Sequence, residues 1–140
     1  MTAVTPLATR PFDDSTDSLL RFGMRLDATL SGAVGLFIAL LADSISSVTG
    51  LSSVAEFIGG ALLVFCGLGV YGLAAVPDLR RVGIAVIAGN VVLSAATLVV
   101  LATGVLPLTG AGVVATLAGS GYFALMGYLQ YLGVRRLPTA

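Results

Sequence analysis

The chain alternates between long apolar stretches and short polar connections. Four stretches carry few charged residues, over about residues 23–42, 54–76, 82–103 and 112–134. A helix of roughly 20 apolar residues spans the about 30 Å hydrocarbon core of a bilayer. The pattern therefore predicts an all-α protein, a bundle of four transmembrane helices within a domain over residues 19–137.

The connections between these stretches contain turn-forming residues. They are residues 43–53, rich in Ser and Gly, then Pro77 and Asp78, and then residues 106–110 around Pro107. Because each connection is short, neighbouring helices are predicted to be antiparallel hairpins. We expect residues 43–53 to form a loop, with Asp43 and Glu56 beside it at the surface.

The arginines divide these connections into two groups. The connections over residues 43–53 and 106–110 contain no basic residue. Positive residues that flank short loops are retained in the cytoplasm. The sequence therefore predicts a multi-pass protein of the cell inner (cytoplasmic) membrane with both termini in the cytoplasm. The arginines near the other helix ends are Arg10, Arg21, Arg25, Arg80, Arg81, Arg135 and Arg136.

Residues 1–18 differ from the rest of the chain. They contain Pro6, Pro11 and the acidic polar run of residues 13–18, and they lack a core pattern. We expect a disordered cytoplasmic tail that acts as a solvated tether, with its last residues capping the first helix. A docking peptide for a partner is the alternative interpretation.

Composition supports the membrane assignment and narrows the chemistry. Hydrophobic residues make up 57% of the chain and charged residues 10%, and the mean hydropathy is +1.05. Soluble domains contain about 25% charged residues. Seven basic residues, all arginine, balance seven acidic ones, and this balance argues against a nucleic-acid partner.

Few reactive residue types are present. The chain has no His or Lys, and Cys66 is its single cysteine. These absences remove His and Lys catalysis, His-ligated metals, intrachain disulfides and CxxC pairs. We therefore expect no enzyme activity, no cofactor and no metal, and we interpret Cys66 as a small packing residue.

Small residues recur at helical spacing in every apolar stretch. One such row consists of Gly112, Thr116, Ser120 and Ala124. Membrane helices associate by close backbone approach at such rows. We interpret most of the 18 glycines as packing positions within the bundle. The alternative is that some rows bind a second copy, giving a homo-oligomer, or a subunit of a larger membrane complex. Interface anchoring is the expected role of the four tyrosines, Tyr71, Tyr122, Tyr128 and Tyr131.

Three polar side chains lie inside the predicted spans, on three different helices. Asp27, Asn90 and Gln130 are about 9, 14 and 8 Å deep, counted from the nearest arginines at about 1.5 Å per residue. Polar groups at membrane depth are costly and are functional candidates. The three lie at similar depth and are predicted to meet, with Ser31 and Ser94 one turn farther along two of the helices.

The partners of Asp27 and the role of the cluster remain open at this level. Its carboxylate is expected to accept hydrogen bonds from Asn90 or Gln130, or from Arg80 or Arg81. One interpretation is a polar pocket that opens to the cytoplasm. The other is an interhelical clamp, worth on the order of 1 kcal/mol per hydrogen bond.

Three segments form a recurring pattern. They are Arg25-Leu26-Asp27-Ala28 with Ser31-Gly32-Ala33, Gly89-Asn90, and Leu129-Gln130-Tyr131-Leu132-Gly133-Val134-Arg135-Arg136. These segments resemble the signature of a family of small four-span integral membrane proteins common in actinobacteria. The resemblance covers nearly the whole chain after the tail and implies the fold and the location. The family has no settled biochemical activity, so the resemblance implies no function. Many relatives carry Trp and Glu where this chain has Leu93 and Tyr128, so no second carboxylate is implied at the site.

Two functions follow from this pattern. The first is a non-enzymatic membrane protein, an accessory or scaffold subunit or a homo-oligomeric bundle, whose main partner is the lipid bilayer. The second is a small transporter or binding protein for a lipophilic or cationic ligand that uses the polar cluster. An enzyme is the least favoured class, because no catalytic set can be assembled from these residues.

Overall fold

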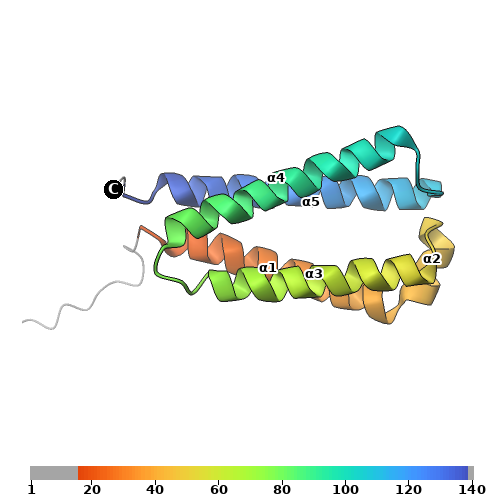
Figure 1. Cartoon of the computed structure of the whole chain (residues 1–140), viewed down its shortest axis with the longest axis horizontal. Coiled ribbons are helices and arrows are strands. Elements are labelled where there is room, and N and C mark those ends of the chain that lie inside the picture. Colours follow the sequence, from red (N-terminus) through yellow and green to blue (C-terminus); the bar gives the residue numbers. More distant parts are fainter. Residues whose placement is uncertain (1–15, 139–140) are drawn as a thin grey trace, which may run out of the picture.

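The computed structural model describes residues 16–138, and this part of the chain is helical without strands (Figure 1). Four long helices confirm the all-α four-helix architecture, and a short helix lies between the first two. The helices are α1 (Ser18–Leu40), α2 (Ala42–Thr49), α3 (Ser53–Leu73), α4 (Leu79–Thr103) and α5 (Gly110–Arg135).

The long helices form two antiparallel pairs. In Figure 1, α1 lies along α3 and α4 lies along α5. Contacts between α1 and α5 join the two pairs, whereas α3 and α4 touch sparsely. Four helix ends, the beginnings of α1 and α4 and the ends of α3 and α5, lie together at one end of the bundle (Figure 1). This end is called the arginine end below.

The surface of the bundle is apolar. All four long helices are long and apolar enough to cross a membrane. Large side chains such as Phe37, Phe65 and Val92 are 59%, 71% and 64% exposed. Such an apolar surface is expected to contact lipid rather than water. These features are those of a multi-pass integral membrane protein.

The first helix extends beyond the predicted apolar span. Helix α1 begins at Ser18, before the predicted start at residue 23, because the first turns pack Leu20 and Met24 into the core. Residues 1–15, which contain Arg10 and most of the predicted tail, lie outside the described residues. Asp17 occupies the N-cap position of α1, and its carboxylate pairs with the Arg21 guanidinium at 2.7 Å.

The predicted loop over residues 43–53 is mostly the helix α2, so this prediction was wrong. The hydroxyls of Ser46 and Ser47 donate to carbonyls of their own helix, at 2.8 and 2.7 Å. Serines placed in this way suit a helix as well as a turn. Gly50 ends α2 in the left-handed conformation at φ 87°, and α2 packs against α3 and α5.

Close approach of α1 and α3 depends on glycine. A Cβ atom at Gly35 would lie 2.6 Å from the Gly60 carbonyl oxygen, and a Cβ atom at Gly67 would lie 2.8 Å from that of Ala28. A Cβ atom at Gly133 of α5 would lie 2.7 Å from the Cα atom of Leu20. Nine of the 18 glycines have neighbouring atoms within 4 Å of an added Cβ atom and nine have none, so the prediction that most of them pack within the bundle was wrong.

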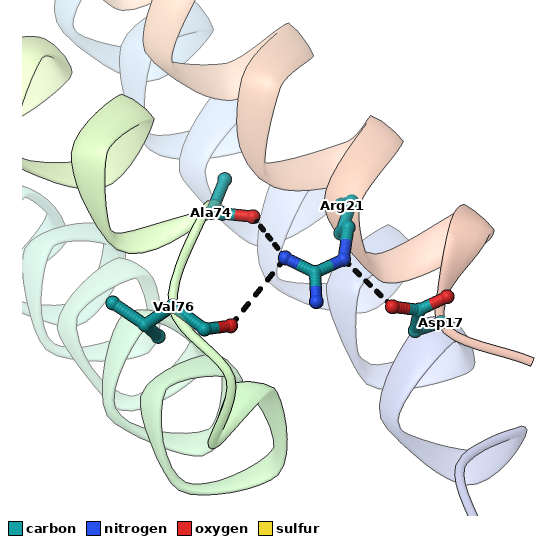
Figure 2. A network of polar contacts seen from close by, with 4 residues as sticks. All are labelled: Asp17, Arg21, Ala74 and Val76. Atoms are coloured by element: carbon teal, nitrogen blue, oxygen red, sulfur yellow. Dashed lines mark hydrogen bonds and ion pairs between the residues drawn. The ribbon is translucent and has the colours of Figure 1, made fainter.

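Six arginines gather at the arginine end, and Arg21 connects two helices there. Its guanidinium donates to the carbonyls of Ala74 at 2.6 Å and Val76 at 3.4 Å (Figure 2). These carbonyls follow the end of α3, so Arg21 ties the beginning of α1 to the α3–α4 connection. The described arginines at this end are Arg21, Arg25, Arg80, Arg81, Arg135 and Arg136.

Candidate functional site: a buried carboxylate beside an intramembrane cavity

Asp27 is the centre of the polar cluster. It lies in the third turn of α1 and is 4% exposed. The apolar residues of α1 that share its face, Met24 and Ala28, are buried as well. The carboxylate therefore points into the bundle, where α4 and α5 supply its partners.

Three neutral groups donate hydrogen bonds to this carboxylate. Asn90 Nδ2 and Gln130 Nε2 donate to Oδ2, at 2.9 and 2.8 Å. Tyr122 Oη donates to Oδ1 at 2.8 Å. Asn90 Nδ2 also donates to Gln130 Oε1 at 3.0 Å, which closes a network across three helices. The predicted meeting of Asp27, Asn90 and Gln130 is thus present in the structure.

Tyr122 was not predicted as part of this cluster. Its hydroxyl also donates to the backbone carbonyl of Asp27, at 3.0 Å. The sequence contained a signal for this role, because Tyr122 lies two helical turns before Gln130 and therefore shares its face. Interface anchoring, the role expected for all four tyrosines, was wrong for this residue.

The alternative prediction, that Arg80 or Arg81 donates to the Asp27 carboxylate, was wrong. Within residues 16–138 the ion pairs are Arg21–Asp17 and Arg81–Asp78, and neither includes Asp27. Arg80 instead donates to the Pro138 carbonyl at 3.4 Å. Within residues 16–138, the guanidinium partners of Arg21, Arg80 and Arg81 lie near the helix termini, and no hydrogen bond or ion pair joins an arginine to Asp27. An ionised carboxylate can only accept hydrogen bonds, and Asp27 is surrounded by donors that bear no charge.

Ser31 and Ser94 occupy different surroundings. Ser31 donates to the Asp27 carbonyl of its own helix at 2.7 Å and adjoins the cluster. Ser94 lies with Ser120, their hydroxyl oxygens 3.0 Å apart. The structure therefore brings Ser31 to the cluster and places Ser94 in a second polar contact between α4 and α5.

A cavity of about 670 Å³ extends from this cluster along the open side of α3 and α4. Asp27 and Asn90 line it at the end nearer the arginines, whereas Gln130 is fully buried. Side chains from all four long helices form its walls, and most of them are apolar. They include Leu63, Cys66, Val70, Val86, Leu93 and Phe123.

Glu56 lines the same cavity, far from Asp27 along the helix axis. It was expected at the surface, but it is 7% exposed, so this expectation was wrong. The helix α2 covers it, and the hydroxyl of Thr49 at the end of α2 donates to Glu56 Oε1. The covering helix was not predicted, and the burial of Glu56 follows from it.

The cluster combines features of a clamp and of a pocket. Every fully buried side-chain nitrogen and oxygen atom within residues 16–138 has a hydrogen-bond partner, as a clamp requires. At the same time, Asp27 and Asn90 face open space on one side. The same hydrogen-bonded network therefore joins the helices, as in the clamp interpretation, and lines a cavity, as in the pocket interpretation.

Comparison of the chain with known protein families, curated proteins and solved structures gives no match. The resemblance to the actinobacterial family thus stays an expectation based on its residues.

Proposed function

We propose that this chain is a non-enzymatic integral membrane protein that binds a lipophilic ligand with a cationic group. One observation supports the proposal most strongly. A buried carboxylate lines a cavity, and its partners within residues 16–138 are neutral donors.

A carboxylate at membrane depth is costly unless it is paired. The three hydrogen bonds to Asp27 offset part of this cost but leave its charge uncompensated. A cationic group placed in the cavity would complete the pairing. The apolar walls would contact the lipophilic body of the ligand, and the cavity volume of about 670 Å³ lies within the usual range for small-molecule sites.

We expect Asp27→Asn to weaken binding of ethidium, a lipophilic monocation, at least about tenfold, equivalent to about 1.4 kcal/mol. Asparagine keeps the shape of the side chain and removes its charge. Binding is measured by ethidium fluorescence on protein in nanodiscs, with empty nanodiscs as the blank. The matched control is Asp43→Asn, which removes a carboxylate from an exposed position on α2 and should bind as wild type does. Equal affinity of wild type and Asp27→Asn would contradict the proposal.

A scaffold or homo-oligomeric bundle is the second candidate function. It is favoured by glycines that the bundle does not use, since Cβ atoms at Gly69, Gly72, Gly119 and Gly121 would meet open space within 4 Å. Such positions allow close approach of another helix. Two results together would favour this candidate over the first. A detergent pull-down would recover a stoichiometric partner or a second copy, and ethidium would bind wild type and Asp27→Asn equally.

We further propose that the arginine end faces the cytoplasm, because positive flanks of short loops are retained there. We expect an impermeant maleimide to label Val105→Cys in intact cells, and Pro77→Cys only after permeabilisation, both in a Cys66→Ser background. Val105 lies 67% exposed between α4 and α5, and Pro77 lies in the exposed connection at the arginine end. The reverse labelling pattern would invert the orientation.

A further inference from the structure

A second carboxylate in the cavity has no assigned role. Glu56 is more than nine-tenths buried, and within residues 16–138 it has one hydrogen-bond partner, the Thr49 hydroxyl on Oε1. Its other oxygen, Oε2, has no hydrogen-bond partner within residues 16–138, and because every fully buried side-chain oxygen there has one, this atom keeps some exposed surface. Glu56 lines the cavity, so one oxygen of its carboxylate is available to a ligand.

The two carboxylates lie at opposite ends of this cavity. Gly67 of α3 packs against Ala28, the neighbour of Asp27. Glu56 precedes Gly67 by three turns of the same helix, which places the carboxylates about 16 Å apart along the axis at about 1.5 Å per residue. The wall between them is apolar and contains small residues, among them Gly59 and Gly60.

The position of Glu56 also favours negative charge. It lies in the first turn of α3, where the free backbone N–H groups and the helix dipole stabilise an anion. Within residues 16–138 the ion pairs do not include Glu56. Like Asp27, it is thus a carboxylate without a cationic partner, beside space that a cation can enter.

We propose that Glu56 is a second site for the cationic group, and that the ligand moves between Asp27 and Glu56 across about half of the roughly 30 Å hydrocarbon core. This inference rests on the proposed function and makes the chain a transporter of lipophilic cations. The sparse contact between α3 and α4 leaves the side of the cavity open. The lipophilic part of the ligand can move along this open side while the cationic group of the ligand leaves one carboxylate and pairs with the other.

The test measures binding and transport of ethidium separately. Binding is measured in nanodiscs, and transport is measured as fluorescence gain in proteoliposomes filled with DNA, relative to protein-free liposomes. We expect Glu56→Gln to bind ethidium within about twofold of wild type and to lower the protein-dependent flux at least tenfold. Asp27→Asn should lose both, and Asp43→Asn neither. Retained binding also shows that Glu56→Gln folds.

Thr49→Val separates the ligand site from a purely structural role of Glu56. It removes the Glu56 hydrogen bond and leaves the carboxylate in place, so we expect flux at the wild-type level or higher. If Glu56 served only to hold α2 on α3, Thr49→Val would lower flux as Glu56→Gln does, and this result would overturn the inference.

Three further outcomes are informative in different ways. Wild-type flux in Glu56→Gln, with binding and flux lost in Asp27→Asn, would overturn the second site and leave the proposed function standing. Loss of binding in Glu56→Gln would also overturn it, because Asp27, the site that sets the measured affinity, is intact in this variant. Unchanged binding in Asp27→Asn would remove the proposed function and this inference together.

Discussion

Gly60→Ala is expected to lower the free energy of unfolding by up to about 3 kcal/mol, through overpacking of the α1–α3 contact. A Cβ atom there would lie 2.5 Å from the Gly35 carbonyl oxygen and 2.6 Å from the Ala39 nitrogen. Both are backbone atoms, which cannot turn away as a flexible side chain can. The helices would have to separate, and loosen the wall of the cavity. Thermal and denaturant-induced unfolding in detergent micelles measure this effect.

Gly69→Ala is the matched control, because it introduces the same methyl group on the same helix. Gly69 has open space within 4 Å of the position of a Cβ atom. Alanine is the better helix former by roughly 0.5–1 kcal/mol, so we expect unchanged or slightly higher stability. Equal destabilisation by the two substitutions would contradict the glycine contact described here.

Asn90→Ala is expected to lower the free energy of unfolding by about 2 kcal/mol. It removes one donor from the Asp27 carboxylate and the donor to Gln130 Oε1, and both acceptors are buried. Hydrogen bonds between membrane helices average about 0.6 kcal/mol with a maximum near 1.7. Gln130 Oε1 would lose its donor, which adds a further penalty of about 1 kcal/mol or more, whereas Asp27 Oδ2 keeps the donor Gln130 Nε2. The same unfolding measurements in micelles test this value.

Thr97→Ala provides the control for Asn90→Ala on the same helix. The hydroxyl of Thr97 donates to the Leu93 carbonyl of its own helix, so its loss leaves the contacts between helices intact and should change stability by under about 0.5 kcal/mol. A double-mutant cycle between Asn90→Ala and Asp27→Ala should give a coupling energy above about 0.5 kcal/mol. Strict additivity would show that the network is not energetically connected.

Stability and binding are expected to be linked through the Asp27 cluster. Asn90, Gln130 and Tyr122 hold the carboxylate at the cavity wall, and the same hydrogen bonds join α1 to α4 and α5. A substitution among these donors therefore changes both the packing of the bundle and the position of the charge. For this reason, Asp27→Asn, which keeps the shape, is the more informative binding variant.

The sequence by itself determined the features that depend on lipid as the solvent. The lengths of the four apolar stretches follow from the thickness of the hydrocarbon core. Short connections imply antiparallel neighbours, and these hairpins bring the beginnings of α1 and α4 and the end of α5 to one end (Figure 1). These helix ends contain Arg21, Arg80 and Arg135. The depth of Asp27, Asn90 and Gln130 along their helices was sufficient to predict that they meet. Each of these inferences uses position along one axis only.

Tertiary structure decided what depends on the rotation and spacing of the helices. Tyr122 joins the cluster because α5 turns that face toward Asp27. Glu56 is buried because α2, a helix of only a few turns, folds over it. The cavity exists because α3 and α4 do not close against each other. Hydropathy reports how deep a residue lies in the membrane, but lipid-facing and bundle-facing surfaces are equally apolar, so the chain alone does not distinguish them.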